Sequence, residues 1–198
     1  MNVLLNGYGG KVGSVLGPGL EAAGHRLVVK LDRADAMVDF TAPDAVIGNL
    51  REAIAAGIPS VIGTTGWDTA LFAEAPVTVF YAPNFAIGAV LMMRFAAEAA
   101  GHLDGAEIVE LHHPAKLDAP SGTAKLTAER MGGDVTIHSV RLPGLNAHQE
   151  VILGGAGETL TIRHDALSRE AYTPGVLLAL EKLSSLPPGL TVGLDMLL

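Results

Sequence analysis

Short apolar runs alternate with helical patterns through the first half of this chain, and this alternation limits the fold more than any other feature. The runs are rich in Val, Ile and Phe and are bounded by Gly, Pro or Asp, as buried strands are. We expect strands at Val3–Leu5, Leu27–Leu31, Met37–Phe40, Ser60–Ile62 and Val77–Tyr81. Helical patterns over Pro43–Ala56 and Asp68–Ala73 lie between some of them. The alternation predicts a parallel sheet with helices on its faces.

The second half, which begins near Phe85, has a different pattern. We expect a long helix over Ile87–His102, a strand over Glu107–Leu111 and a helix over Thr123–Met131. Three more strand candidates follow, of which the last two are joined through glycines as a hairpin: Val135–Val140, Gln149–Leu153 and Thr159–Arg163. This order of elements favours an α+β segment over another strand-helix-strand unit. A final helix over Pro174–Ser184 is expected to pack on the first sheet.

Charge and composition argue against several classes of protein. Thirteen basic and 21 acidic residues give a formal charge of −8, whereas nucleic acids and anionic membranes select basic surfaces. No apolar run approaches the ~20 residues of a membrane span, and the N-terminus shows no signal-peptide pattern. The chain has no cysteine and therefore no disulfide or thiolate site. We expect a soluble cytoplasmic protein in which any anionic ligand needs a local cationic pocket.

A glycine-rich loop follows the first predicted strand and reads Gly7-Tyr8-Gly9-Gly10-Lys11-Val12-Gly13. Glycines allow the backbone to approach a pyrophosphate closely, and the N-terminus of the next helix supplies free N–H groups. The spacing fits G-x-x-G-x-x-G better than the usual G-x-G-x-x-G. The loop predicts dinucleotide binding, with a tight turn that holds no ligand as the alternative.

Two features indicate that the nucleotide fold is altered. Gly17-Pro18-Gly19 falls inside the first helix, which we expect to be kinked or cut short because Pro costs about 3 kcal/mol within a helix. Only the residues from Arg33 to Ala36 separate the second and third strand candidates, although a parallel crossover needs a dozen or more. We therefore expect that one strand and its helix are missing from the sheet.

The second strand candidate ends where an acidic residue usually binds the cofactor ribose, ~20 residues beyond the glycine loop. Asp32 has this position, and we expect it to contact the ribose. Arg33 beside it is a candidate partner for the 2′-phosphate of the phosphorylated cofactor, and an ordinary surface charge pair is the alternative.

A cationic cluster precedes the predicted helix at Thr123. His112, His113 and Lys116 lie directly after a strand, and Ser121-Gly122-Thr123 begins the helix, where a hydroxyl and free N–H groups can hold a carboxylate. Such a cluster predicts a site for a small dianionic substrate. In the alternative reading, Ser121 is only a helix cap, Lys116 is solvated and the histidines are packing residues. A metal site is not expected, because adjacent histidines on a strand point to opposite faces.

Five segments in this order resemble motifs of the dihydrodipicolinate reductase family. They are similar to its G-x-G-G-R-M-G, D-F-T-x-P, G-T-T-G, A-P-N-F-S-x-G and E-x-H-H-x-x-K-x-D-A-P-S-G-T-A motifs and lie at Gly7–Gly13, Asp39–Pro43, Gly63–Gly66, Ala82–Gly88 and Glu110–Ala124. Lys11 and Val12 replace the usual Arg-Met, and Ala86 replaces a serine. The chain is also short for the family, in the part near the adenosine ribose.

The resemblance implies a fold and an activity. The fold is α/β, with a shortened Rossmann-like dinucleotide-binding domain from residues 1–86 and 172–198 and an α+β substrate-binding and oligomerisation domain from residues 87–171. The implied reaction is the NADH- or NADPH-dependent reduction of 4-hydroxy-tetrahydrodipicolinate, a small cyclic dianion, in diaminopimelate and lysine biosynthesis. The resemblance also implies a homotetramer.

Site residues are carried over by position in these motifs. His112 and Lys116 become the catalytic pair, with Lys116 as the general acid, although His112 is an alternative proton donor. His113, Gly122 and Thr123 match the substrate-carboxylate positions. Ser121, at the start of the helix, is a further candidate for substrate binding. The implied cofactor-binding positions are Gly7, Tyr8, Gly9, Gly10, Lys11, Val12, Gly63, Thr64, Thr65, Ala82, Pro83, Asn84 and Phe85.

Some residues and functions stay open at this stage. Arg141, His148, Arg163 and His164 are candidates for further positive charge in the pocket, and we favour roles for them as exposed strand or subunit-contact residues. Three alternative functions remain: another two-domain dehydrogenase of a small amino or hydroxy acid, a catalytically silent dinucleotide sensor, and a structural oligomerisation protein.

Overall fold

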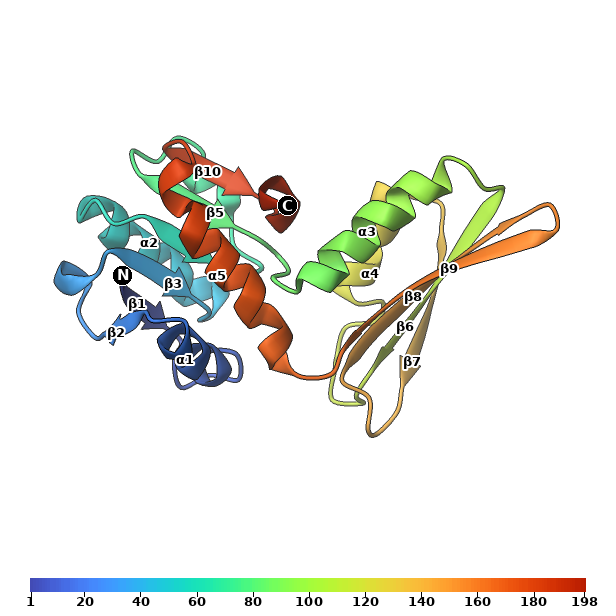
Figure 1. The fold of residues 1–198 in the computed structure, drawn as a ribbon, viewed down its shortest axis with the longest axis horizontal. Helices are drawn as coiled ribbons and strands as arrows, with labels where there is room; N and C mark the ends of the chain where they lie inside the picture. Colours follow the sequence, from blue (N-terminus) through green and yellow to red (C-terminus); the bar gives the residue numbers. More distant parts are fainter. The chain divides into compact units, whose positions relative to one another are not determined.

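The computed structural model describes residues 1–198, which form two compact units (Figure 1). The first unit combines Met1–Ile87 with Arg169–Leu198, and the second is Gly88–Ser168. None of the helices combines the length and the hydropathy needed to cross a bilayer.

The first unit contains a six-stranded parallel sheet in the order β10-β5-β4-β3-β1-β2. Its strands are β1 (Asn2–Asn6), β2 (Arg26–Val28), β3 (Ala36–Asp39), β4 (Ser60–Ile62), β5 (Thr78–Tyr81) and β10 (Gly189–Val192). Its α-helices are α1 (Gly13–Ala22), α2 (Pro43–Ala55) and α5 (Thr173–Lys182). Short 3-10 helices are η1 (Leu31–Arg33), η2 (Thr69–Phe72), η3 (Arg169–Tyr172), η4 (Leu183–Ser185) and η5 (Leu194–Leu197). The predicted Rossmann-like parallel sheet is confirmed, although β10 was not expected.

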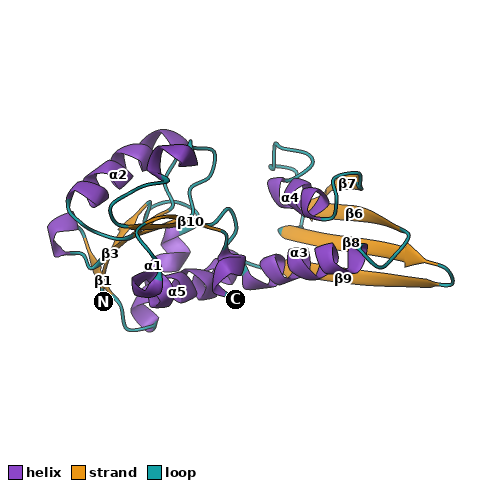
Figure 2. Ribbon diagram, turned by 90° about the horizontal axis from the view of Figure 1, so that it is seen from above, coloured by secondary structure: helices purple, strands orange, loops and turns teal.

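Helices cover both faces of this sheet, which explains its apolar central strands. Figure 2 shows α2 on one face and α1 with α5 on the other. Every residue of β3 and β4 is buried, as expected for parallel strands between two helical layers. On α2, the buried residues Val46, Leu50 and Ala53 recur at the spacing of one helical face and pack on the sheet.

The short link between β2 and β3 is possible because these strands are not neighbours. They pair with β1 on its two opposite sides. A doubly wound dinucleotide sheet has the strand order 3-2-1-4-5-6, in which another strand lies beyond the second one. Here β2 is the edge of the sheet. The expectation that a strand and its helix are missing is therefore confirmed.

The first helix is not cut short at Pro18, so that alternative of the expectation was wrong. Helix α1 continues from Gly13 to Ala22 with Pro18 inside it. Its Leu16 and Leu20 are completely buried, and burying a leucine side chain contributes about 1.5–3 kcal/mol. Their packing is therefore large enough to offset the roughly 3 kcal/mol cost of an interior proline.

The second unit consists of a mixed sheet and two helices. It contains α3 (Ile87–Ala100), β6 (Gly105–His112), α4 (Gly122–Arg130), β7 (Thr136–Arg141), β8 (Ala147–Gly155) and β9 (Glu158–Ala166). The strand order is β7-β6-β8-β9, and both helices lie on the same face (Figure 1). The predicted β8–β9 hairpin is confirmed. However, β6 and β7 pair in parallel through α4, because the intervening segment is long enough for a crossover. The expectation that this half contains no strand-helix-strand unit was wrong.

Two helical glycines are expected to respond in opposite ways to substitution by alanine. A Cβ at Gly175 in α5 would lie 2.0 Å from the Phe85 carbonyl oxygen, whereas a Cβ at Gly48 in α2 would have no atom within 4 Å. Gly48→Ala should raise the free energy of unfolding by about 0.5–1 kcal/mol, because alanine is the better helix former. Gly175→Ala should lower it by about 1–3 kcal/mol through overpacking. Urea unfolding of both variants tests this, and equal shifts of the same sign would contradict it.

Candidate functional site

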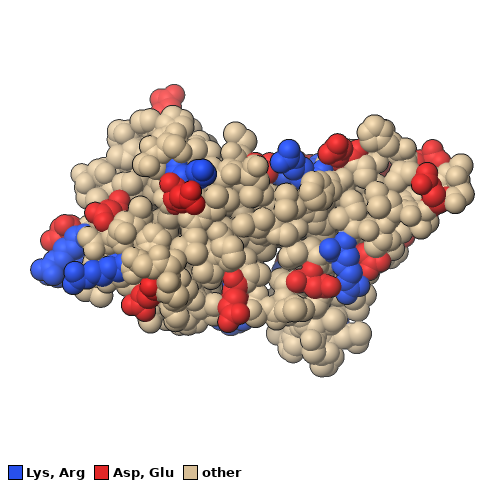
Figure 3. Space-filling view, viewed as in Figure 1, with Lys and Arg blue, Asp and Glu red and all other residues tan.

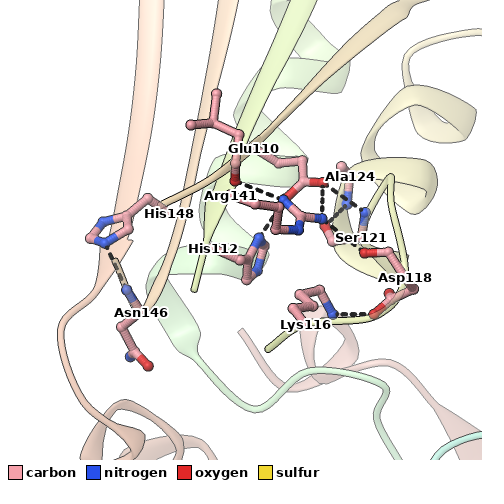
Figure 4. Close-up of polar contacts among 10 residues, drawn as sticks. Glu110, His112, Lys116, Asp118, Ser121, Ala124, Arg141, Asn146 and His148 are labelled. Carbon is pink, nitrogen blue, oxygen red and sulfur yellow. Dashed lines mark hydrogen bonds and ion pairs between the residues drawn. The ribbon is translucent and has the colours of Figure 1, made fainter. Parts of the chain in front are cut away.

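A buried ion pair lies at the carboxyl end of β6. Glu110 is fully buried, and Arg141 on the neighbouring strand β7 donates to both of its carboxylate oxygens, at 2.9 Å and 2.7 Å. His112 Nδ1 also contacts the Glu110 carboxylate, and the backbone N–H of Ser121 donates to it at 3.2 Å. Figure 4 shows these groups converging from β6, β7 and the start of α4. One carboxylate therefore joins the histidine at the end of β6 to the first residue before α4.

The partners of Glu110 determine its charge. Burial alone raises the pKa of Glu110, but hydrogen bonds from Arg141, Ser139 and His112 outweigh burial and lower the pKa to about 2. For His112, burial lowers the pKa. The Glu110 carboxylate raises this pKa, whereas the charges of Lys116 and Arg141 lower it, and the net shift is downward. The site thus holds an ionised carboxylate beside an imidazole that favours its neutral form near neutral pH.

The depressed pKa of Glu110 predicts a loss of stability in acid. Its folded-state pKa of about 2 lies below the ordinary 4.5, so the stabilisation is complete above pH 4.5 and is lost as the pH falls toward 2. The loss attributable to this group should be about 3 kcal/mol. Denaturant unfolding as a function of pH checks this, with Glu110→Gln as the control that lacks the titration. Parallel losses of stability in both chains would contradict the prediction.

The loop after β6 carries the other predicted substrate residues. Lys116 Nζ lies 2.8 Å from Asp118 Oδ1, and the Lys116 side chain is 30% exposed. His113 is exposed, and its Nδ1 accepts the backbone N–H of Ala115 at 3.1 Å, which leaves Nε2 as the protonated nitrogen. The hydrogen bond from Lys116 lowers the pKa of Asp118. The loop therefore presents a lysine and a histidine donor beside His112.

The first turn of α4 borders this loop. Ser121 is the N-cap: its hydroxyl accepts the Ala124 N–H at 3.2 Å, and the residue is only 2% exposed. That hydroxyl serves as a helix cap, as the alternative sequence reading proposed. Gly122 is exposed and Thr123 partly exposed at the positive end of the helix. The backbone N–H of Gly122 donates to the Asp118 carboxylate, so the backbone of this turn already holds a carboxylate while the Ser121 hydroxyl caps the helix.

The four candidate cations of the later strands do not all lie on the same face of the second sheet, and they do not all have the same partners. Arg141 joins Glu110 and also donates to the Asp118 carbonyl at 2.8 Å, and its side chain is only 19% exposed. Treating it as an exposed strand residue was therefore wrong. His148 and Arg163 lie on the other face of the sheet and pair with Asp165. His164 packs against Gly88 on the helical side, where a Cβ at Gly88 would lie 2.6 Å from its Cδ2.

The glycine loop connects β1 to α1 in the first unit. Gly7 has a φ of +85°, and a Cβ at Gly13 would lie 2.1 Å from the Gly7 carbonyl oxygen, so the tight turn requires both glycines. Gly9 differs, because a Cβ there would have no neighbour within 4 Å. The turn itself therefore does not require glycine at position 9, where the absent side chain leaves the backbone open to a ligand. Tyr8 and Lys11 are exposed beside it.

A buried carboxylate that the sequence did not single out supports this end of the sheet. Asp39, at the end of β3, is fully buried. Its Oδ1 accepts from Thr41 N, Thr41 Oγ1 and Thr64 Oγ1 at 3.0, 2.7 and 2.8 Å, and its Oδ2 accepts from Asn49 at 2.7 Å. Asp39 thereby ties the Gly63–Thr65 turn to β3 and α2. Its place in the D-F-T-x-P segment was the available signal.

The remaining predicted cofactor residues differ in accessibility. Gly63 is partly exposed and Thr65 exposed, whereas Thr64 is buried and donates to Asp39. Ala82 and Phe85 are buried, and the Phe85 ring packs on Phe40 and Phe80 with centroid distances of 5.5 and 6.1 Å. Pro83 is exposed, and Asn84 Oδ1 accepts the Ala86 N–H at 2.9 Å. The buried side chains of Thr64, Ala82 and Phe85 can support the site, whereas Thr65, Pro83 and Asn84 are at least partly accessible.

Asp32 and Arg33 lie in η1, on the connection that leads back to the start of β3, and both are exposed. Strand β2 already ends at Val28, so Asp32 does not lie directly at its end. Arg33 lines a pocket of about 530 Å³ along β2 together with Arg26 and Lys30. Lys and Arg side chains gather at this end of the first unit (Figure 3). The structure thus offers cations here, but not the expected strand-end position for Asp32.

Both halves of the chain match family models. Residues 22–85 match the N-terminal part of dihydrodipicolinate reductase, and residues 88–198 match its C-terminal part. A 4-hydroxy-tetrahydrodipicolinate reductase of Desulfitobacterium hafniense is 51% identical over 211 residues, covering 89% of this chain and 79% of the relative. One of Mycolicibacterium gilvum is 43% identical over 243 aligned residues, covering 100% of this chain and 99% of the relative. Since this chain has 198 residues, that relative carries residues that this chain lacks.

Solved structures agree with the family models. The dipicolinate-bound dihydrodipicolinate reductase of Paenisporosarcina superposes with a TM-score of 0.85 at 30% identity and covers 100% of this chain and 99% of its own. A myo-inositol dehydrogenase of Corynebacterium glutamicum, at 15% identity and a TM-score of 0.58 over 96% of this chain and 91% of its own, shares only the fold.

Proposed function

The chain belongs to the dihydrodipicolinate reductase family, and from this premise we propose that it reduces 4-hydroxy-tetrahydrodipicolinate to tetrahydrodipicolinate in diaminopimelate and lysine biosynthesis. The reaction consumes NADH or NADPH and one proton, and it releases water. The observation that carries the proposal is the cluster at the end of β6, where His112 and Lys116 lie beside the first turn of α4 (Figure 4). The Paenisporosarcina relative binds dipicolinate, which is likewise a small cyclic dianion.

Some residues of this cluster would bind the substrate, and another would transfer the proton. The backbone N–H groups at Gly122 and Thr123 and the donor nitrogen of His113 would hold the substrate carboxylates, since a helix N-terminus favours anions. The Lys116 ammonium would act as the general acid and donate the proton to the reduced substrate. His112 would act beside it as a polar partner whose ring is fixed by Glu110.

The first unit fits a dinucleotide. When bound, the reduced nicotinamide supplies the hydride. The backbone around Gly7 and Gly9 would hold the pyrophosphate, because Gly9 leaves open space where a side chain would stand. The Gly63–Thr65 turn and the Ala82–Phe85 segment would border the nicotinamide end. Arg33 would favour a 2′-phosphate, and Asp32 beside it in η1 would contact the ribose.

The test is the oxidation of reduced cofactor with freshly prepared 4-hydroxy-tetrahydrodipicolinate, with NADH and NADPH in separate assays. Turnover with either cofactor supports the reaction. Arg33→Ala should raise the KM for NADPH more than the KM for NADH, because only NADPH carries the 2′-phosphate. Cofactor binding without turnover would favour the dinucleotide sensor, and the absence of both would favour a structural protein.

Three further assignments rest on the family. We propose that residues 1–86 and 172–198 bind the dinucleotide and that residues 87–171 bind the substrate and mediate a homotetramer. The face of the second sheet opposite α3 and α4 carries the partly exposed apolar residues Val109, Leu111 and Val140, which would suit subunit contact. Light scattering tests the tetramer. A cytoplasmic location is the last of these proposals, and cell fractionation tests it.

A further inference from the structure

Glu110 and Arg141 form a buried ion pair in the second unit, and the proposed reaction assigns Arg141 no role. The Glu110 side chain is 0% exposed and the Arg141 side chain 19%. Beyond its two bonds to Glu110, Arg141 donates to the carbonyl oxygens of Val140 and Asp118, each at 2.8 Å. The pair therefore connects β6 and β7 to the loop that carries Lys116.

The contact between Glu110 and His112 determines which imidazole nitrogen carries a proton. An ionised carboxylate only accepts hydrogen bonds, so His112 must donate its Nδ1 proton to Glu110. In the neutral imidazole, Nε2 is then the unprotonated nitrogen and acts as an acceptor. A neutral His112 in this tautomer cannot donate a proton from Nε2, whereas Lys116 in the neighbouring loop can donate from Nζ.

From this arrangement we propose that Glu110 and Arg141 are positioning residues for the reduction: Glu110 fixes the tautomer and orientation of His112, and Arg141 holds Glu110 and the Lys116 loop in place. The inference rests on the proposed function. The Arg141 guanidinium donates to both carboxylate oxygens of Glu110 and also to the backbone carbonyl oxygen of Asp118. One guanidinium therefore sets the distance between the end of β6 and the loop. His112 would then accept a hydrogen bond while Lys116 supplies the proton.

The first experiment needs no turnover. Long-range proton–nitrogen NMR of histidine-labelled protein reports the protonation of His112 across pH in the wild type, Glu110→Gln and Arg141→Met. The charges that face His112 are Glu110 on its own strand, Arg141 on β7 and Lys116 in the following loop. Removing the Glu110 carboxylate should lower the pKa of His112, and removing the Arg141 cation should raise it. The same spectra report the tautomer: the neutral ring of the wild type should carry its proton on Nδ1, and a ring protonated on Nε2 would contradict the inference.

The second experiment separates positioning from binding. Glu110→Gln should lower kcat roughly 10–100-fold, the size of loss that follows removal of the partner that orients a metal-bound histidine, with little change in the KM for the cofactor. Glu107→Gln is the matched control: Glu107 lies on the same strand and pairs with His138 at 2.8 Å, but 61% of its side chain is exposed. That variant should keep the wild-type rate.

The outcomes are separable. An inactive wild type contradicts the proposed function, and the NMR titration still tests the positioning pair. An unchanged His112 pKa in a folded Glu110→Gln, or a kcat within twofold of the wild type, overturns the inference. If Glu110→Gln does not fold, the Glu110→Gln/Arg141→Met double variant removes both charges and leaves no unpaired buried ion. A double variant with wild-type kcat and an unchanged kinetic pH profile would equally overturn the inference.

Discussion

Lys116→Ala is expected to lower kcat roughly 10²–10⁴-fold, the contribution of a positioned proton donor. The folded state should be almost unaffected, because the lysine is partly exposed and its pair with Asp118 is a surface ion pair worth about 0–1 kcal/mol. Cofactor binding should persist, because the glycine loop belongs to the first unit. Steady-state oxidation of reduced cofactor measures the rate, and cofactor fluorescence measures the binding.

Lys125→Ala provides the control for this variant. Lys125 is an exposed residue of α4, in the helix that borders the same loop, and its removal makes the same change in net charge. It should keep the wild-type rate. If Lys116→Ala retains a kcat within a few-fold of the wild type, the proton comes from another group, and the imidazolium form of His112 becomes the donor to test.

Asp39→Ala is expected to lower the free energy of unfolding by about 3–5 kcal/mol, because each buried donor left without a partner costs about 1–3 kcal/mol. The substitution removes the acceptor of two hydroxyls, one amide side chain and one backbone N–H. It should also raise the KM for the cofactor, because Thr64 would lose the bond that holds the Gly63–Thr65 turn. Urea unfolding and cofactor titration measure the two effects.

Asp44→Ala is the matched control for that variant. Asp44 is exposed in the first turn of α2, where a carboxylate contributes only about 0.3–1 kcal/mol through the helix dipole. Similar losses of stability in the two variants would show that burial and hydrogen bonding of Asp39 do not matter as argued. A wild-type KM for the cofactor in a folded Asp39→Ala variant would show that cofactor binding does not depend on the bond between Asp39 and the Gly63–Thr65 turn.

Much of the candidate site could be predicted because its residues are close in the sequence. Strand β6, its loop and the N-cap of α4 form one continuous segment, so His112, Lys116 and Ser121 could be assigned to one site from their order alone. Arg141 could not be assigned, because only the parallel pairing of β6 with β7 brings it beside Glu110. The role of Asp39 could not be assigned either, because its partner Thr64 lies 25 residues further along the chain, in the turn after β4.

The sequence by itself determined the parallel sheet, the change of pattern near Phe85 and the glycine turn, because hydrophobic period and glycine placement act over neighbouring residues. Tertiary structure alone decided three other features. Packing of Leu16 and Leu20 carries α1 through Pro18. Placement of β2 and β3 on opposite sides of β1 makes their short link possible. Burial of Glu110 against Arg141 sets the charge and the tautomer at the site, since the strength of an ion pair depends on the three-dimensional surroundings of both groups.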